Sequence, residues 1–532
     1  MGRLSQATDD RAWGVAQRLA AAPRLAGWLW ALIRADALAP REIDPLLAPW
    51  PRSLARLLRL FASRRSRQGR PGQRLAAVLE TQGPVAIKLG QFLSTRADIF
   101  GVAFADDVGR LKDQLAPFPN DQAATQVEAA LGRPLGAVFT EVLPPVAAAS
   151  LAQVHPARLP DGRRVAVKLL RPGVERRVRE DAGVLRLAAA LAERWAPRAA
   201  RLEPRAFAET IVRALQLELD LRFEAAGADE LRQVMDHDGY MSAPKVIWDG
   251  VARRMLTLEW VDGAPLSDFA GLPAGLDRPR LANDLIRGFL AQALDHGVFH
   301  ADLHEGNLFI APGGAVTAVD FGIMGRLGET ERRYLANILW GFIQRDYAKV
   351  AESHFSAGYV PAHHDPAAFA QALRAVGEPI FGRQAQEVSM GRLLTQLFDI
   401  TALFDMRLRP ELVLLQKTMV TVEGVGRRID PHLDIWAAAE PVVRRWISRE
   451  LSPARRLRTL GQAGASVLVR LAEAAVEPDA QAGGRLDEEP ARPGWRGQAI
   501  DGRWRGVTLD PWSLIAGAAI AAAAFAAAYW AP

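Results

Sequence analysis

Three oxygen-bearing side chains near the middle of the chain have the types and spacing of a site for metal-bound phosphate. The segment from His300 to Asn307 reads HADLHEGN and contains Asp302, and Asp320 follows thirteen residues after Asn307. Carboxylate and amide oxygens are ligands that Mg²⁺ prefers, and phosphate oxygens complete its coordination. We therefore expect Asn307 and Asp320 to bind a metal ion, and Asp302 to accept or orient a proton.

Two alternatives involve the same segment. His300, Asp302 and His304 alternate along the chain, and alternate side chains of an extended segment point to one side, which could create the metal site of a hydrolase. A loop with only a structural role is the other alternative. Neither accounts for Asn307 or for the Asp-Phe-Gly that begins at Asp320. An aspartate and an asparagine five positions apart, followed by a hairpin and Asp-Phe-Gly, are typical of kinase-like sites, which is the favoured interpretation.

Composition limits the chemistry without choosing a partner. The chain has 532 residues, of which 49% are hydrophobic, enough for the cores of two to four domains. It has no cysteine, which excludes disulfides, thiolate metal sites and cysteine nucleophiles. The net charge of +6 suits an anionic partner such as a nucleotide, a nucleic acid or an acidic lipid. Lysines are scarce among the 66 basic residues, most of which are arginine. A lysine in such a chain suggests a position that needs a compact ammonium group, which makes Lys88 and Lys168 functional candidates.

The pattern of residues predicts an α+β, two-lobed, protein-kinase-like fold. Short β-prone runs at 138–142, 151–158, 164–170, 245–248 and 255–260 predict a small antiparallel sheet. A helical stretch is expected from about 180 to 235, and a hairpin at 309–319 interrupts a helical region at 277–475. We expect a helical extension at 1–135, an N-lobe at 136–262, a C-lobe at 263–475, a linker at 476–508 and a membrane helix at 509–532.

The two ends of the chain differ in character. Apolar residues at helical spacing in the first fifty residues predict an amphipathic segment, which packs on the body or lies on a membrane surface; packing is favoured. Residues 512–530 are free of charge and nearly long enough to span a bilayer, with a buried terminal helix as the alternative. Arg503 and Arg505 before this stretch predict a cytoplasmic location for the large domain. Small residues from Gly517 to Ala528 suggest a homodimer through this helix.

Residues of the predicted sheet supply candidates for nucleotide binding. Lys168 ends the strand Val-Ala-Val-Lys, from which kinase-like folds reach the α and β phosphates. Alanines stand in the preceding loop where such folds have glycines, and their Cβ atoms make the loop stiffer. The backbone near Glu259 and Val261 is expected to contact the base. The candidate contacts in the loop are Val146, Ala147, Ala148, Ala149, Ser150, Gln153 and Val154.

A lysine at the phosphates needs an acidic partner. Glu218 and Glu224 are the candidates, and their separation of six residues places them on different faces of one helix. One of them is expected to pair with Lys168 while the other faces elsewhere. A solvated acidic helix face without a role in the site is the alternative interpretation.

Five motifs in order resemble the UbiB family of atypical kinase-like proteins, over residues 40 to 450. They are Lys88-x-Gly-Gln91, the alanine loop ending in Ser-Leu-Ala-Gln-Val-His155, Glu218-x-Asp220-x3-Glu224, the segment 300–307, and Asp320-Phe-Gly. Gly227 is a departure, since many members of the family have asparagine there. A terminal membrane segment also resembles bacterial members.

The resemblance implies roles for individual residues. It implies that Lys168 and Glu218 form the ion pair, that Asp302 is the catalytic aspartate, and that Asn307 and Asp320 are the metal ligands. It also implies that ATP and Mg²⁺ are the cofactors, that the protein acts in ubiquinone biosynthesis, and that it lies in the bacterial inner membrane. The regulatory candidates are Lys88 and Gln91, on an added helix that covers the place where a protein substrate docks, and Glu224.

The sequence after Gly322 opposes ordinary protein phosphorylation. Six residues separate Gly322 from the helix expected at 329–343, which leaves no room for an activation segment, and Ala301 replaces the arginine that pairs with a phosphorylated loop. The favoured hypothesis is an ATPase that supports ubiquinone synthesis. A small-molecule or lipid phosphotransferase and a non-catalytic scaffold are the alternatives. Membrane lipid, quinone-biosynthesis enzymes and a quinone-like lipid are candidate partners, and nucleic acid is not expected.

Overall fold

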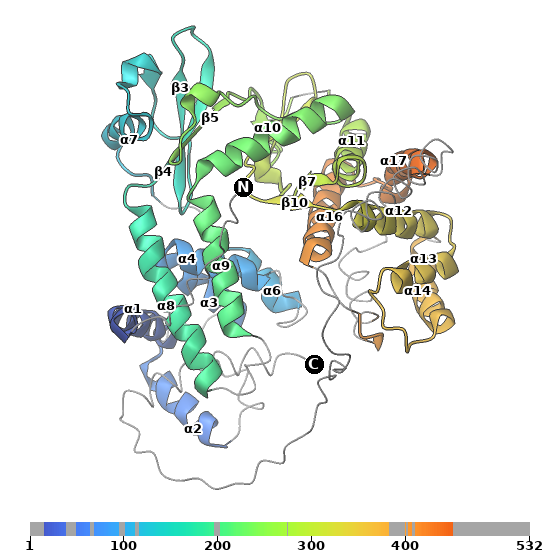
Figure 1. Cartoon of the computed structure of the whole chain (residues 1–532), viewed down its shortest axis with the longest axis horizontal. Helices are drawn as coiled ribbons and strands as arrows, with labels where there is room; N and C mark the ends of the chain where they lie inside the picture. The colour runs from blue at the N-terminus through green and yellow to red at the C-terminus, as the bar shows by residue number, and fades with distance from the viewer. Residues whose placement is uncertain are drawn as a thin grey trace, which may run out of the picture.

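The computed structural model describes most of the chain between residues 15 and 450. The described residues are 15–38, 49–63, 69–94, 102–111, 116–195, 203–273, 275–381, 400, 403–406 and 410–450. Figure 1 shows a small sheet flanked by α7, long helices α8 and α9 that run from it beside the N-terminal helices, and a second, mainly helical lobe.

The N-lobe contains a five-stranded antiparallel sheet. Its order is β1-β3-β4-β5, with β2 paired to the same strand β3. One face packs against α7 in a core that includes Val127 and Val167, whereas Lys168 lies on the opposite face beside its cross-strand neighbours Val154 and Leu256. The elements are α7 (Asp121–Leu131), η4 (Leu135–Ala137), β1 (Glu141–Val142), β2 (Ala147–Ala148), β3 (Ala152–Arg158), β4 (Arg164–Leu170), η6 (Trp248–Gly250) and β5 (Met255–Glu259).

Two of the predicted strands differ from the observed ones. Within the run at 138–142 only β1 is a strand, and the 3-10 turn η4 precedes it. The run at 245–248 is not a strand: Val246 makes a single bridge to Leu258, and η6 begins at Trp248. A short β-prone run without a continuous partner strand cannot satisfy its backbone groups as a ladder, and a turn satisfies them locally.

Three helices replace the single helical stretch expected at 180–235. They are α8 (Val174–Trp195), α9 (Pro204–Glu218) and α10 (Leu221–Asp238). Asp220 separates the last two, because its side chain accepts a hydrogen bond from the N–H of Arg222 at 3.2 Å and caps the N-terminus of α10. Glu218 therefore ends one helix and Glu224 lies in the first turn of the next.

The N-terminal extension packs on the outer side of α8. Leu25 of α1 shares a core cluster with Val184 and Leu187 of α8, and Arg24 forms ion pairs at 2.6 Å with Glu180 and Asp181. The prediction that this segment packs on the body is confirmed for the helix α1. The described elements of the extension are α1 (Val15–Arg34), α2 (Pro49–Leu58), η2 (Arg59–Phe61), α3 (Pro71–Gln82), α4 (Pro84–Ser94) and α6 (Val102–Gly109).

The C-lobe is mainly helical, with two small sheets at the site. One sheet has the order β6-β8-β9, and the other pairs β7 with β10. Its elements are β6 (Ala264–Pro265), α11 (Arg278–Ala291), η7 (Gln292–His296), β7 (Val298–His300), η8 (Glu305–Asn307), β8 (Leu308–Ile310), β9 (Val316–Ala318), β10 (Met324–Arg326), α12 (Glu329–Ile343), α13 (Tyr347–Ser356), α14 (Pro366–Phe381), α16 (Pro410–Ile429) and α17 (Ile435–Glu450).

The predicted hairpin at 309–319 and the helix at 329–343 are confirmed as β8–β9 and α12. The predicted linker at 476–508 and membrane helix at 509–532 lie outside the described residues. Of the helices within the described ranges, none has both the length and the apolar character needed to cross a bilayer.

Candidate active site

Lys168 joins the two lobes at the predicted phosphate site. It lies on β4, and its Nζ atom is 2.7 Å from Oε1 of Glu224 on α10 and 3.2 Å from Oδ1 of Asp320, which follows β9. The lysine side chain is 21% exposed and that of Glu224 only 9%, so this pair is largely removed from water, whereas the Asp320 side chain is 52% exposed. An ammonium and an open carboxylate are thus held side by side, as phosphate and metal binding require.

The charges of this cluster reinforce one another. Burial by itself would lower the pKa of Lys168, but the carboxylates of Asp320 and Glu224 outweigh it and raise that pKa, so the lysine is a cation at neutral pH. The same lysine lowers the pKa of Asp320 to about 2, against the opposing effect of burial. Asp320 is therefore an anion ready to bind a cation.

The backbone of Asp320 is strained in a way that places its carboxylate. Its φ is +63°, in the left-handed region that few residues other than glycine adopt. The side chain then accepts a hydrogen bond from the N–H of Gly322 at 3.3 Å. Strain of this kind persists only where surrounding contacts hold it, and here Lys168 and the buried Phe321 provide them.

The structure corrects the predicted partner of Lys168. The ion pair with Glu218 implied by the family resemblance does not form, because Glu218 instead bonds Lys88 of α4, with Nζ 2.6 Å from Oε1. Glu224, a regulatory candidate on the sequence, occupies the position next to Lys168. The reason is the break between α9 and α10 at Asp220. It places Glu218 at the end of one helix and Glu224 at the start of the next, so the two side chains point to different partners.

Asp302 and Asn307 are fixed by a short turn after β7. The side-chain amide of Asn307 donates to the carbonyl oxygen of Asp302 at 3.0 Å, which leaves the Oδ1 atom of Asn307 as the available metal ligand. Asn307 is 8% exposed, whereas the side chain of Asp302 is 35% exposed and open to an acceptor. With Asp320, these oxygens fit Mg²⁺, and a bound ion would neutralise charge on the phosphates.

The histidines of this segment are structural, which excludes the alternative of a two-histidine metal site. Nδ1 of His300 accepts from the N–H of Asp302 at 3.1 Å, and Nε2 lies 3.2 Å from the carbonyl of Val319. Burial lowers the pKa of His300 and keeps the ring neutral. Nδ1 of His304 accepts from the N–H of Gly306 at 3.0 Å. Each ring thus positions backbone near Asp302 instead of coordinating metal.

The alanine loop is a tight hairpin whose tip is buried. The N–H of Ala149 donates to the carbonyl of Ala152 at 2.8 Å, and the tip residues Ser150 and Leu151 are 4% and 8% exposed. Pro84, the first residue of α4, and Ser150 line the same pocket, so the added helix begins beside the loop. None of the loop residues 146–151, which the structure describes, has a positive φ. This agrees with the alanines there, because a Cβ atom disfavours positive φ.

The predicted contacts in this loop divide into two groups. Ala147 and Ala148 form β2, and Val154 faces the same side of the sheet as Lys168. Gln153 points to the opposite face, is 1% exposed, and accepts a hydrogen bond from the N–H of Phe118 at 2.9 Å. Alternation along β3 therefore turns the Gln153 side chain into the core, away from the face that carries Lys168. Val146 is exposed at the edge of the loop.

Exchanging Ala148 for glycine tests the stiffness of this loop. Ala148→Gly is expected to strengthen ATP binding roughly two- to five-fold, because the backbone can then turn its amides toward phosphate, while the melting temperature changes little. Calorimetric titration with ATP and a thermal melt of the same sample measure both. Ala252→Gly, on the far side of the sheet, is the matched control. Equal effects of Ala148→Gly on affinity and stability would contradict the interpretation.

The hinge after β5 offers backbone groups to a base. The N–H of Glu259 is occupied by the carbonyl of Lys245 at 2.8 Å, whereas the N–H of Val261 makes no hydrogen bond to another described residue. The N–H of Val261 therefore remains available for the predicted contact with the base. For Glu259, only the backbone carbonyl remains available.

The added helix α4 packs closely over this lobe. A Cβ on Gly90 would lie 2.1 Å from a methyl of Leu111 and 2.9 Å from one of Leu79, so only glycine permits the contact with α3 and the segment after α6. Gln91 is half-buried on the same helix. Lys88 makes the ion pair with Glu218 described above, which ties α4 to the end of α9. The scarcity of lysine signalled Lys88, but its partner could not be read from the sequence.

The chain after the Asp-Phe-Gly motif returns at once into the lobe. The strand β10 pairs with β7, placing Met324 opposite His300, and α12 begins three residues after β10 ends. This strand was not predicted, and only Leu327 and Gly328 separate it from α12, so the chain has no activation segment at this point. Gly227 faces the same place: a Cβ there would lie 3.3 Å from Met324 and 3.7 Å from the carbonyl of Phe321.

Comparisons with known proteins decide the family. Residues 110–354 match the model of the ABC1 atypical kinase-like domain, and residues 373–434 match that of the UbiB helical domain. A probable protein kinase UbiB of Marinobacter nauticus is 37% identical over 446 residues, or 81% of this chain and 80% of the relative. The chain belongs to the UbiB family. The resemblance stated from its motifs is therefore confirmed.

A second relative and one solved structure are also similar to this chain. A probable protein kinase UbiB of Xanthomonas euvesicatoria is 41% identical over 404 residues, which are 74% of this chain and 72% of that protein. The complex of Rv3197 with erythromycin from Mycobacterium tuberculosis is 20% identical, covers 69% of this chain and 90% of its own, and has a TM-score of 0.50. The similarity to this solved structure concerns the fold alone. The fold is kinase-like, and a kinase-like fold implies in general that ATP is bound with Mg²⁺.

Proposed function

We propose that this UbiB-family protein binds ATP with Mg²⁺ between its lobes and hydrolyses it slowly in support of ubiquinone biosynthesis. The observation that carries the proposal is the cluster of Lys168, Glu224 and Asp320, in which a phosphate-binding ammonium and a metal-binding carboxylate from different lobes meet within 3.2 Å. Asp302 and Asn307 complete the set of groups that nucleotide chemistry needs.

Two further observations support nucleotide turnover without transfer to a protein. β10 follows the Asp-Phe-Gly motif directly, and α12 begins three residues after β10 ends, which leaves no activation segment in this part of the chain. The α4 helix is tied to α9 through Lys88 and Glu218, and its first residue, Pro84, lines a pocket together with Ser150 of the alanine loop. A peptide therefore lacks its usual platform, while water or a small acceptor can reach the partly exposed Asp302.

The cellular setting is part of the proposal. Residues 509–532 anchor the protein in the bacterial inner membrane, with the large domain in the cytoplasm and a homodimer formed through the terminal helix. The partners are membrane lipid and quinone-biosynthesis enzymes or a quinone-like lipid. The charge-free stretch at 512–530 and the arginines before it support this arrangement.

Quinone content in cells tests the function. A strain that lacks its own family member is supplied with the wild-type chain, Asp302→Asn or Asp320→Asn, and ubiquinone is quantified. The wild type is expected to restore ubiquinone and both variants to fail, at equal protein levels. Wild-type quinone levels with both variants would exclude an enzymatic role and favour a scaffold. If labelled phosphate is transferred from ATP to an added small molecule or lipid, the protein is a phosphotransferase and the proposal of hydrolysis is wrong.

A further inference from the structure

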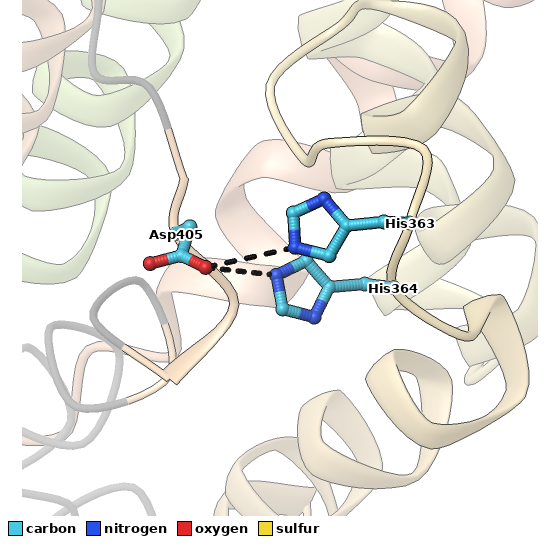
Figure 2. Close-up of side chains that lie close together, drawn as sticks. All are labelled: His363, His364 and Asp405. Atoms are coloured by element: carbon cyan, nitrogen blue, oxygen red, sulfur yellow. Dashed lines mark hydrogen bonds and ion pairs between the residues drawn. The ribbon is translucent and has the colours of Figure 1, made fainter. Parts of the chain in front are cut away.

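A second cluster of ligand-type side chains lies far from the nucleotide site, at the edge of the helical C-lobe. His363 and His364 stand in the turn between α13 and α14, and Asp405 belongs to the short described segment 403–406. Figure 2 shows both imidazole rings directed at the carboxylate of Asp405. The nucleotide chemistry proposed above uses none of these residues.

The geometry brings three ligand atoms together. Nε2 of His364 is 3.2 Å and Nε2 of His363 is 3.8 Å from Oδ2 of Asp405, and the two rings lie 4.1 Å apart between centroids. One ligand atom from each residue lies within 4.8 Å of the others, and this is the one such group found within the described ranges. Adjacent side chains normally diverge; here a turn closed by the N–H of His364 and the carbonyl of Pro361 directs both to one side.

The surroundings fix the backbone beside Asp405, whose own side chain is 70% exposed. Asp405 has a φ of +49°, in the left-handed region, and follows Phe404, which is 7% exposed. The ring of Phe404 packs on Phe369 of α14 at 4.9 Å and on His364 at 5.3 Å. The same aromatic contact therefore sets the positions of one histidine and of the aspartate that faces it.

We infer that His363, His364 and Asp405 bind a divalent transition metal ion such as Zn²⁺. Two imidazole nitrogens and one carboxylate suit zinc and its neighbours, with water in the remaining position, whereas Mg²⁺ prefers an all-oxygen site. Metal–ligand distances are about 2.0–2.2 Å, and the side chain of His363, 65% exposed, has freedom to close on the ion. The ion would clamp the α13–α14 turn to the segment at 403–406.

Direct hydrogen bonding accounts for only part of the arrangement. His364 alone is at hydrogen-bond distance from Asp405, and the 3.8 Å separation of His363 is too long for one. A single metal ion between the rings would account for both nitrogens facing the same carboxylate oxygen.

Zinc titration of the untagged full chain tests the inference. The chain carries Asp320→Asn, which removes the metal site of the nucleotide cleft from the measurement. Equilibrium dialysis against ZnCl₂ with elemental analysis is expected to give one Zn²⁺ per chain, retained in excess Mg²⁺. In the same background, His363→Ala is expected to weaken binding at least about ten-fold. His432→Ala, at another exposed histidine of the C-lobe, is the matched control and should leave binding unchanged.

Folding and site geometry are checked separately. Because His363 is exposed, the metal-free melting curve of His363→Ala should coincide with that of its parent. Asp405→Asn keeps the shape and removes the charge, and it should also weaken binding. X-ray absorption of the zinc-loaded chain should show two imidazole ligands. Zinc binding that is unchanged in His363→Ala, or absent from the parent chain, would overturn the proposal. These outcomes leave the nucleotide function untouched.

Discussion

Asp320→Asn is expected to lower the rate of ATP hydrolysis by about 100-fold or more. The substitution keeps the size of the side chain and removes the negative charge that binds the metal ion, and a single group that stabilises charge in a transition state contributes a factor of about 10² to 10³. Asparagine also tolerates the left-handed backbone conformation that Asp320 adopts at a φ of +63°. The effect therefore reports on charge, without a change in local fold. Release of ADP by the full-length protein in Mg²⁺ measures it.

The control for this prediction is an aspartate that is also exposed to solvent but has only a structural role. Asp346 caps α13 by accepting a hydrogen bond from the N–H of Lys349 at 3.1 Å. Asp346→Asn is expected to keep the hydrolysis rate, since asparagine is also a good N-cap residue. Retention of more than a tenth of the wild-type rate by Asp320→Asn would show that this carboxylate does not hold the catalytic metal ion.

Glu224→Gln is expected to weaken ATP binding roughly thirty-fold. Loss of one partner from a desolvated, hydrogen-bonded charge pair costs about 2 kcal/mol or more, which corresponds to that factor. Lys168 would be left with Asp320 as its carboxylate partner, and would then compete with the metal ion for that oxygen. Calorimetric titration with ATP in Mg²⁺ gives the affinity. The same titration without Mg²⁺ removes the competition between Lys168 and the metal ion for Asp320, so any weakening that remains is due to the displaced lysine.

Glu218→Gln is the matched comparison, because it removes the same charge from the other glutamate of the motif. Glu218 bonds Lys88 at 2.6 Å, so its loss is expected to loosen α4 while changing ATP affinity much less than Glu224→Gln does. If Glu218→Gln weakens ATP binding as much as Glu224→Gln or more, then Lys168 pairs with Glu218 in the nucleotide-bound protein. That result would restore the pairing implied by the family resemblance.

The two pairs have different consequences for the molecule. Lys168 with Glu224 positions the phosphate-binding ammonium inside the N-lobe. Lys88 with Glu218 connects the added helix α4 to α9, two residues before the cap of α10. Because α10 carries Glu224, a shift of α4 would be transmitted to the site through a short path. The motif Glu-x-Asp-x3-Glu thus serves both the site and the helix that covers it.

The order and spacing of residues along the chain predicted the chemistry of the site. Asp302, Asn307 and Asp320 are polar groups separated by a hairpin of fixed length, and local rules suffice to predict β8, β9 and α12 around them. The strand that carries Lys168 was predicted for the same reason, since its alternation and flanking turns are local properties. The absence of room after Gly322 also follows from counting residues alone.

Tertiary structure alone decided which groups meet. The choice of Glu224 over Glu218 depends on the direction of two helices on either side of Asp220, which a sequence period cannot give. The face of β3 that carries Gln153 depends on register, and the burial of Leu151 depends on a core built from distant segments. The sequence alone determined which chemical groups the protein has, because residue types and local spacing specify them. Packing between distant segments decided their partners, because long-range contacts are set by the whole fold.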